Sequence, residues 1–260
     1  MGDLPGRAFL AELARAAAAE TLPRFRTEGA VTNKLGEGFD PVTEADRAAE
    51  GAIRALIEAR YPEHGIIGEE HGSVRADASH VWIIDPIDGT RAFISGLPVW
   101  GTLVGLTVDG IARCGFMHQP FTDELFLADG DGAALLQGER TPRALSTRGG
   151  VDLAAATLFT TTPALYTGDK RERYDALEAR VRLPRYGCDC YAFAMVAAGH
   201  ADIAVEAGLA PYDICGLVPL IEQAGGVVTR WDGGRPEQGG DIIAAGSAEL
   251  HAAALEILAP

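Results

Sequence analysis

The sequence has no excess of basic residues: 22 Lys and Arg stand against 37 Asp and Glu, a formal net charge of −15. A protein that binds a nucleic-acid backbone needs a basic face, so this balance argues against a nucleic-acid partner. A small phosphorylated metabolite stays open as a partner, because bound divalent cations reverse the local sign of a carboxylate-rich site. The question is therefore where the acids lie and whether some of them converge.

Long apolar runs and abundant cysteines are also lacking. No stretch of about 18 apolar residues occurs, so we expect no membrane span. The first 20 residues also lack the pattern of a signal peptide. The cysteine spacing matches neither a zinc site nor a disulfide framework, which predicts reduced thiols and a cytoplasmic protein. The four cysteines are Cys114, Cys188, Cys190 and Cys215.

Two common catalytic motifs are missing as well. The GxxxxGK[ST] phosphate loop does not occur, which argues against a nucleotide kinase or ATPase. None of the six histidines lies in HExxH or a comparable pattern. If the protein binds a metal, oxygen ligands favour Mg²⁺ or Mn²⁺ over Zn²⁺.

The expected elements predict an α/β protein in two parts. Residues 7–21 form an amphipathic helix, and a second helix begins after Thr43, with Asp46 in the capping-box position, and ends before Tyr61. Apolar residues 81–84 form a strand, and residues 99–128 form an antiparallel meander. The second half alternates strands (158–162, 201–207, 227–231, 241–246) with helices (170–182, 191–200, 213–224, 247–258).

Two local features refine this division. Pro219 lies inside the helix expected over 213–224, so that helix must kink or begin late. The polar, Gly-rich stretch 138–152 is the expected boundary, which divides the chain into parts 1–145 and 146–260.

The strongest chemical signal is DPIDGT over residues 85–90. Asp85 and Asp88 follow a buried strand, and Pro86 between them predicts a tight turn. If a helix starts at Thr90, its free N–H groups form a seat for an anion beside the two acids. Such an arrangement suits Mg²⁺ bridging a phosphate, whereas the plain alternative is a capped turn with surface acids.

Other acids also lie at the ends of expected elements. Glu69 and Glu70 follow two isoleucines, Asp213 precedes a helix, and Asp46 lies at a helix start. Taken singly, each has an ordinary interpretation as a solvated pair or a helix cap. Together, at the ends of elements near short apolar strands, they are less easily explained as unrelated surface acids.

These residues stand in strings that resemble the inositol monophosphatase family of Mg²⁺-dependent phosphomonoesterases. The resemblance runs from about Lys34 to the last strand. It implies a layered α/β (α+β) sandwich, with a large antiparallel sheet followed by a smaller α/β part, and a homodimer. The matching strings are DPVTEAD (40–46), GEE (68–70), WIIDPIDGT (82–90) and PYD (211–213) followed by AGG (224–226).

The resemblance also implies roles for individual residues around two or three Mg²⁺ ions, with Mn²⁺ as the alternative. A first ion would be held by Glu69, Asp85, the Ile87 carbonyl and Thr90. A second would be held by Asp85, Asp88 and Asp213, and a weaker third would lie near Glu69 and Glu70. The phosphate would meet the Gly89 and Thr90 amides. Asp46, paired with the Thr90 hydroxyl, would act with Glu69 to activate a metal-bound water. Lys34 would lie nearby as a supporting charge; the alternative is an ordinary surface lysine.

Residues 185–213 resemble the histidinol-phosphatase branch more than the inositol branch. Asp189 suits a cationic amine, unless it is a buried helix cap, and Glu206 occupies a position that contacts the organic part of the substrate. Cys188 stands where a second glycine is expected in this loop. The resulting substrate-site residues are Asp88, Gly89, Thr90, Gly187, Asp189, Glu206 and Asp213.

The sequence thus predicts a phosphatase that hydrolyses L-histidinol phosphate to L-histidinol and phosphate. An inositol-1-phosphatase or a broad sugar-phosphate phosphatase is the alternative within the class. A phosphatase for 3′-phosphoadenosine phosphates would need a basic nucleotide pocket, which is not evident. A regulatory binding protein without catalysis is the alternative from another class.

Overall fold

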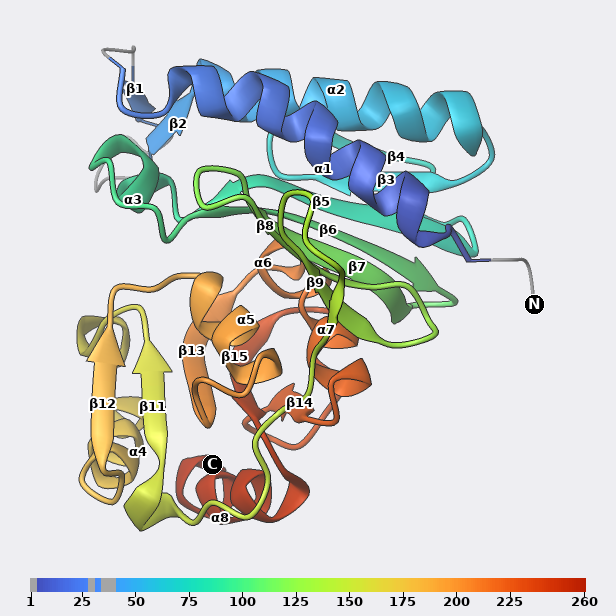
Figure 1. The fold of residues 1–260 in the computed structure, drawn as a ribbon. Helices are drawn as coiled ribbons and strands as arrows, with labels where there is room; N and C mark the ends of the chain where they lie inside the picture. Colours follow the sequence, from blue (N-terminus) through green and yellow to red (C-terminus); the bar gives the residue numbers. More distant parts are fainter. Residues whose placement is uncertain (1–3, 28–30, 34–40) are drawn as a thin grey trace.

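Five layers build the molecule, as the ribbon in Figure 1 shows for the computed structural model. The structure describes residues 4–27, 31–33 and 41–260. Two long helices cover one face of an eight-stranded sheet, and short helices lie between that sheet and a five-stranded sheet. A last pair of helices covers the far face of the smaller sheet. This is the mixed, layered α/β fold that the sequence predicts.

The larger sheet comprises strands from the first part of the chain, in the order β10-β9-β8-β7-β6-β5-β3-β4. The predicted meander is confirmed, because β5 to β9 pair with their neighbours in antiparallel fashion, while β3 and β5 are parallel. The strands are β3 (Gly65–Gly68), β4 (Gly72–Val74), β5 (His80–Asp88), β6 (Gly101–Val108), β7 (Ile111–Gln119), β8 (Glu124–Ala128), β9 (Ala133–Leu136) and β10 (Arg143–Ala144). A separate two-stranded pair joins β1 (Val31–Asn33) to β2 (Pro41–Thr43).

Helices α1 (Arg7–Thr21) and α2 (Glu44–Arg60) have the predicted bounds. Thr43 caps α2, and its backbone N–H donates to Asp46 Oδ2 at 2.9 Å, which completes the predicted capping box with Asp in place of Glu. Ile53 and Ile57 of α2 are buried against Trp82 and Ile84 of β5. The helix thus fixes one face of the strand that ends in the DPIDGT string.

Side chains of the larger sheet alternate between the two cores. Val104, Phe116 and Leu127 point toward α1 and α2, whereas the adjacent Leu103 and Met117 join the core under the short helices. This period of two is what a sheet covered on both faces requires. The short helices α5 (Tyr191–Ala197), α6 (Pro211–Ile214) and α7 (Val218–Gln223) come from the second part of the chain. The two parts therefore share one hydrophobic core.

The smaller sheet has the order β12-β11-β13-β15-β14. Its strands are β11 (Thr157–Thr160), β12 (Leu183–Tyr186), β13 (Ile203–Leu209), β14 (Val227–Arg230) and β15 (Gly240–Ala245). Helices α4 (Asp169–Glu178) and α8 (Ala248–Leu258) pack on its far face through Tyr174 and Leu250. Short helices complete the described chain: η1 (Leu22–Arg24), α3 (Thr90–Ile94), η2 (Leu153–Ala155) and η3 (Pro163–Leu165).

Three predicted elements differ from the structure. The helix expected over 170–182 ends at Glu178, and the chain continues as β12, an edge strand with too few apolar residues to be seen in the sequence. The helix expected over 191–200 ends at Ala197. The helix expected over 213–224 is two helices, and Pro219 lies in the first turn of the second, where a missing N–H is tolerated.

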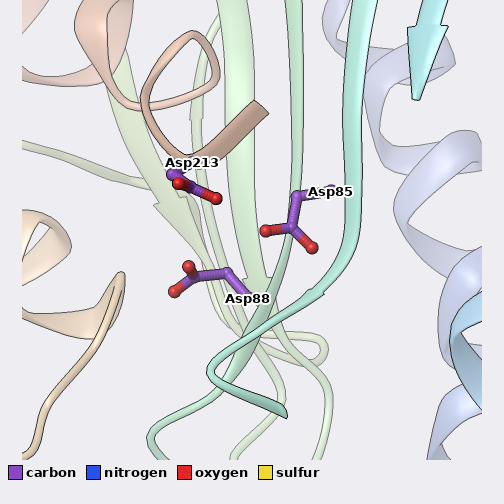
Figure 2. Close-up of side chains that lie close together, drawn as sticks. All are labelled: Asp85, Asp88 and Asp213. Atoms are coloured by element: carbon purple, nitrogen blue, oxygen red, sulfur yellow. The ribbon is translucent and has the colours of Figure 1, made fainter. Parts of the chain in front are cut away.

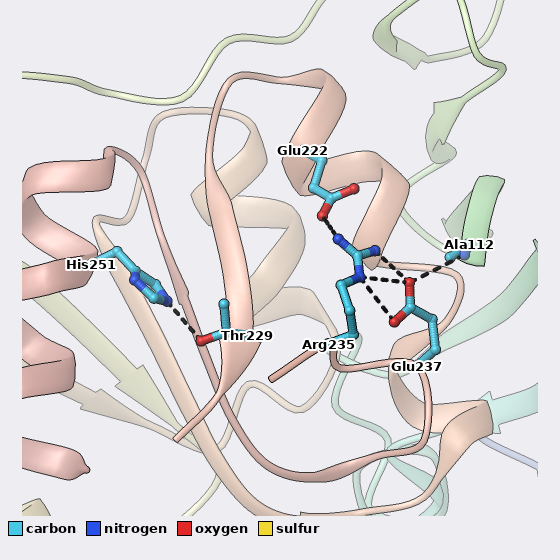
Figure 3. A network of polar contacts seen from close by, with 6 residues as sticks. All are labelled: Ala112, Glu222, Thr229, Arg235, Glu237 and His251. Carbon is cyan, nitrogen blue, oxygen red and sulfur yellow. Dashed lines mark hydrogen bonds and ion pairs between the residues drawn. The ribbon is translucent and has the colours of Figure 1, made fainter. Parts of the chain in front are cut away.

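A polar network ties the loop after β14 to the larger sheet (Figure 3). Glu237 is 3% exposed, and its Oε1 accepts a hydrogen bond from the Ala112 backbone N–H at 3.2 Å. Arg235 donates to the same carboxylate and, at 2.6 Å, to Glu222 Oε1. The Glu237 carbonyl oxygen accepts from the Cys215 thiol at 3.2 Å. Glu237 thus joins strand β7, through its side chain, to the connection between α6 and α7, through its backbone.

Candidate active site

Three carboxylates from two distant parts of the chain converge between the two sheets (Figure 2). Each of Asp85, Asp88 and Asp213 offers one oxygen, and these oxygens lie within 4.8 Å of one another. Asp85 is 2% exposed, and the other two are partly buried. The sequence brought these residues together only by resemblance, whereas the structure places them side by side.

Strand β5 positions the first two acids. The strand runs through Asp88, so the expected tight turn after Ile84 is wrong; pairing with β6 resumes at Asp88–Gly101 after an irregularity. The Thr102 hydroxyl donates to the Pro86 carbonyl at 2.8 Å, which keeps this segment on the sheet. Pro86 is tolerated because the ladder is interrupted there. Asp85 Oδ1 accepts from the Ile87 N–H at 3.0 Å, which fixes its direction.

Asp213 reaches the other two because its helix lies very close to the larger sheet. Gly105 and Gly115 face each other across β6 and β7. A Cβ added at Gly105 would lie 2.6 Å from the carbonyl carbon of Cys215, and one at Gly115 would lie 2.9 Å from the Gly216 oxygen. Two strand glycines thus form the seat for the α6–α7 connection. Asp213 is the third residue of α6 and not the N-cap that its ordinary interpretation predicts; its Oδ2 instead accepts from the N–H of Ala210, the residue that does cap the helix, at 2.7 Å.

Burial and mutual repulsion both disfavour the charged forms of these acids. Burial, then the charges of Glu69, Asp88 and Asp213, together with a hydrogen bond shared with Glu69, raise the pKa of Asp85 well above its usual range. Burial and the charges of Asp213 and Asp189 likewise raise the pKa of Asp88. A divalent cation would relieve this repulsion, and carboxylate oxygens are the ligands that Mg²⁺ prefers. The residues present therefore fit such an ion.

Glu69 and Glu70 lie where the sequence predicts, directly after β3. The Glu69 N–H donates to the Ile84 carbonyl at 3.2 Å, so this turn lies beside the strand that carries Asp85. Glu70 is held at 3.9 Å from Arg47 Nε, and only 4% of its side chain is exposed. Two of the predicted ligands thus share one short connection.

Asp46, Thr90 and Ile87 are arranged differently from the expectation. The Asp46 carboxylate accepts from both the N–H and, at 2.5 Å, the hydroxyl of Thr43. The Thr90 hydroxyl donates to the Ile87 carbonyl at 3.1 Å, so the expected Asp46–Thr90 pair is wrong for this conformation. The physical reason is the capping box, which engages Asp46 at the start of α2. Burial raises the pKa of Asp46 to about 6 despite the hydrogen bonds from Thr43, and the charge of Glu70 adds to the rise.

A pocket of about 310 Å³ opens beside the three carboxylates. Gly89, at φ = +80°, and Thr90 lie on its wall, and α3 begins at Thr90, which meets the condition for an anion seat. A Cβ at Gly89 would lie 3.1 Å from the Asp189 carboxylate, so the two sides of the pocket are in close contact there. Four carboxylates line the pocket: Asp88, Asp189, Glu206 and Asp213.

Thr161 connects two further carboxylates of the pocket, Asp189 and Glu206. Its N–H donates to Glu206 Oε1 at 2.5 Å, and its hydroxyl donates to Asp189 Oδ1 at 3.5 Å. Burial raises the pKa of Glu206 to about 8, and the charges of Asp189 and Asp213 add to this rise. Burial also raises the pKa of Asp189, which the hydrogen bond from Thr161 and the charge of Arg91 oppose. Asp189 has φ = +42°, and Gly187 in the same loop has φ = +76°.

Several residues that build this site were not predicted. Gly105 and Gly115 carry a signal, since a glycine inside a strand often marks close approach of another backbone. Thr161 and Arg91 carry none, because their role depends on the fold of the second part. Lys34, the predicted supporting charge, lies outside the described residues.

A model of the inositol monophosphatase family matches residues 5–259. The chain belongs to this family. It is thus a phosphatase that acts on a phosphorylated small molecule, from a family of metal-dependent enzymes that usually use Mg²⁺. Within the described residues, no helix combines the length and the apolar character that a membrane span requires.

Relatives named for different activities resemble the chain to a similar degree. The bifunctional phosphatase IMPL2 of Arabidopsis thaliana is 39% identical over 90% of this chain and 69% of its own. A histidinol-phosphatase of Mycobacterium tuberculosis is 36% identical over 89% of this chain and 90% of its own length. The structure of an inositol monophosphatase from Zymomonas mobilis superimposes with a TM-score of 0.85 at 37% identity, over 96% of both chains. The family is therefore shown, while its members differ in substrate.

Proposed function

We propose that this family member is a histidinol-phosphatase, which hydrolyses L-histidinol phosphate to L-histidinol and inorganic phosphate. The observation that carries the proposal is the pair Asp189 and Glu206, which share a pocket with Asp88 and Asp213, two of the converging aspartates, and are connected by Thr161. A substrate with phosphate at one end and an ammonium group at the other matches this division of the pocket.

The phosphate end is assigned to the acids around β5. Asp85, Asp88 and Asp213, with Glu69, the Ile87 carbonyl and Thr90, would hold two Mg²⁺ ions, with a third near Glu70. When bound, these ions neutralise phosphate oxygens and lower the pKa of the attacking water. The Gly89 and Thr90 N–H groups would donate to the phosphate. Glu69, with Asp46 in support, would orient the water and accept its proton.

The amine end is assigned to Asp189 and Glu206. Without a cation nearby, burial holds the pKa of Glu206 at about 8, so this carboxyl is protonated over much of the neutral range. An ammonium group beside it would favour the carboxylate and release that proton. The polyhydroxyl ring of an inositol phosphate carries no charge that would do so.

The relatives support the proposed activity, and the cysteines support a cytoplasmic location. A histidinol-phosphatase aligns with almost the whole chain, and its own length is covered to 90%. All four cysteines are free, as expected for a cytoplasmic enzyme. The family resemblance adds a homodimer, which sedimentation or light scattering of the purified protein would test.

A parallel substrate assay tests the function. Phosphate release from L-histidinol phosphate, D-inositol 1-phosphate and glycerol 2-phosphate should be measured with Mg²⁺, with Mn²⁺ and with EDTA. We expect the highest kcat/KM for histidinol phosphate and no release in EDTA. Comparable or better turnover of inositol 1-phosphate would contradict the substrate assignment and leave the metal-dependent phosphatase intact.

The Asp189→Asn variant tests the amine end. Loss of one charge facing the ammonium should raise KM for histidinol phosphate about tenfold, or roughly 1.4 kcal/mol, with a smaller effect on glycerol 2-phosphate. Asp77→Asn, an exposed site in the β4–β5 connection, is the matched control. Equal changes for both substrates would refute the ammonium contact.

A further inference from the structure

A fully buried acid on α2 supports the connection that carries Glu69 and Glu70. Glu50 has no exposed surface. Its Oε2 accepts from the Glu70 N–H at 2.7 Å, and its Oε1 accepts from the His71 N–H at 3.2 Å and from Arg54 Nε at 2.7 Å. One carboxylate thus binds two consecutive N–H groups of a turn that is about 20 residues away in the sequence.

One face of α2 contacts the same turn over two helical turns. Arg47, Glu50 and Arg54 are spaced by three and four residues, so their side chains project from the same face. Arg47 lies 3.9 Å from Glu70 Oε2, and its carbonyl is 3.0 Å from His71 Nε2. Arg54 donates to the Gly72 carbonyl on the far side of the turn. The helix therefore holds both ends of the connection from β3 to β4.

Close packing prevents the Glu50 carboxylate from shifting. A Cβ added at Gly68 would lie 1.9 Å from Glu50 Oε1, so the carboxylate lies directly against the last residue of β3. Arg54 balances its charge in place, with 13% of the arginine side chain exposed. An acid that is buried, paired and triply hydrogen-bonded is a rigid support for its partners.

We propose that Glu50 and Arg54 are positioning residues that set the affinity of the active site for its divalent cation, by holding Glu69 and Glu70 in place. The inference rests on the proposed function, in which Glu69 and Glu70 are metal ligands. Ligand oxygens must be placed within about 0.2 Å of their ideal distances from a metal. Residues that orient ligands from behind typically change metal affinity by about 10–100-fold when they are replaced.

Metal binding without substrate is the direct test. Manganese titrations followed by electron paramagnetic resonance and calorimetry should compare the wild type with Glu50→Gln, Arg54→Lys and the control Glu58→Gln, an exposed acid on the same helix. Glutamine keeps the shape of Glu50 but places an amide against one of its three donors. We expect the Mn²⁺ dissociation constant to rise at least about tenfold in Glu50→Gln and roughly threefold in Arg54→Lys. The control should stay within twofold.

Kinetics separate positioning from a merely structural role. In both variants the half-saturating Mg²⁺ concentration should rise in parallel with the Mn²⁺ constant, while KM for the phosphate ester at saturating Mg²⁺ changes less than about twofold. Circular dichroism in EDTA shows whether each variant is folded. If Glu50→Gln does not fold, Arg54→Lys decides the question.

The outcomes are distinguishable. A folded variant with unchanged metal affinity and lowered thermal stability alone would overturn the positioning role and leave the metal site standing. A wild-type protein that binds no Mn²⁺ would overturn the metal site itself, and with it the role of Glu50.

Discussion

Asp213 shows, at the scale of single residues, how the requirements of the proposed metal site oppose those of folding. In the absence of metal, its charge raises the pKa of both Asp85 and Asp88, so the three carboxylates destabilise one another. The same proximity is what suits them to a cation. If the charge of Asp213 serves only to bind a metal, its removal should not destabilise the metal-free protein.

The Asp213→Asn variant tests this opposition. The amide can still accept from the Ala210 N–H, so the helix cap is kept while one repelling charge is lost. In EDTA we expect the melting temperature to rise by about 2–4 °C, the equivalent of roughly 1 kcal/mol in a chain of this size. With Mg²⁺, kcat/KM should fall by more than about 100-fold.

Calorimetry in EDTA and phosphate release in Mg²⁺ provide the two readouts, with Asp77→Asn as the exposed control. A fall in melting temperature would mean that Asp213 stabilises the fold, and retained activity would remove it from the metal site.

At this scale the sequence predicted the acids better than their partners. Asp85, Asp88 and Asp213 were found because their strings are specific to a family. Glu50 was missed although it carries a signal: it lies four residues after Asp46 and three before Ile53, on the stripe of α2 that is otherwise buried. A charged residue on such a stripe must find partners, and which ones depends on the turn that packs there.

At the scale of elements, the short helices α6 and α7 decide where the second part contributes to the site. Their connection lies on Gly105 and Gly115, and no larger side chain fits beneath the Cys215–Gly216 backbone. The position of Asp213, two residues before Cys215, is thereby set by two glycines in another sheet. Removing that close approach should separate Asp213 from the β5 acids.

The Gly105→Ala variant tests this seat. Its methyl group would lie 2.6 Å from backbone atoms of Cys215, so α6 must move or the sheet must bend. We expect a loss of roughly 2–3 kcal/mol in the free energy of unfolding and weaker Mn²⁺ binding. Gly51→Ala is the matched control, because a Cβ on Gly51 of α2 contacts nothing within 4 Å.

The control variant should gain about 0.5–1 kcal/mol, since alanine favours the helix. Urea unfolding and metal titration provide the comparison. If Gly105→Ala binds Mn²⁺ like the wild type, the seat does not determine the position of Asp213.

Elements with local signals were predicted closely. The capping box at Thr43 and the apolar period of α2 fixed that helix to the residue. In the meander expected over 99–128, turns at Asp109 and Asp123, both at positive φ, separate the strands. The path of β5 through Asp88 was not predicted, because pairing with β6 and the Thr102 bond to Pro86 hold a segment that looks like a turn. Long-range pairing overrode the local preference there.

At the scale of the whole molecule, the two parts are joined by a shared core and by Glu237. Burial raises the pKa of Glu237, but hydrogen bonds from Arg235, its own N–H and Ala112 outweigh burial and leave the pKa below its usual value of 4.5. A lowered folded-state pKa contributes stability above pH 4.5, which is lost as the pH falls through the lowered value.

The Glu237→Gln variant tests this link. At pH 7 its free energy of unfolding should be about 1–2 kcal/mol lower than that of the wild type, because hydrogen bonds to a charged acceptor are replaced by weaker ones. The difference from the wild type should persist down to about pH 5 and shrink at lower pH.

Denaturant unfolding between pH 3.5 and 8 measures this profile. Glu256→Gln, an exposed acid of α8, should change stability by less than about 0.5 kcal/mol throughout. A pH-independent difference would show that Glu237 acts through packing and not through its charge.

By itself the sequence determined the layered fold, the acids proposed as metal ligands and the bounds of the first, second and last long helices, because these depend on periodicity, caps and strings that are local in the chain. The tertiary structure decided what depends on distance: the meeting of Asp213 with β5 over the glycine seat, the bond from Thr161 that connects Asp189 and Glu206, and the support of Glu69 and Glu70 by Glu50. Each of these joins residues that are about 20 or more positions apart, where only packing brings the partners together.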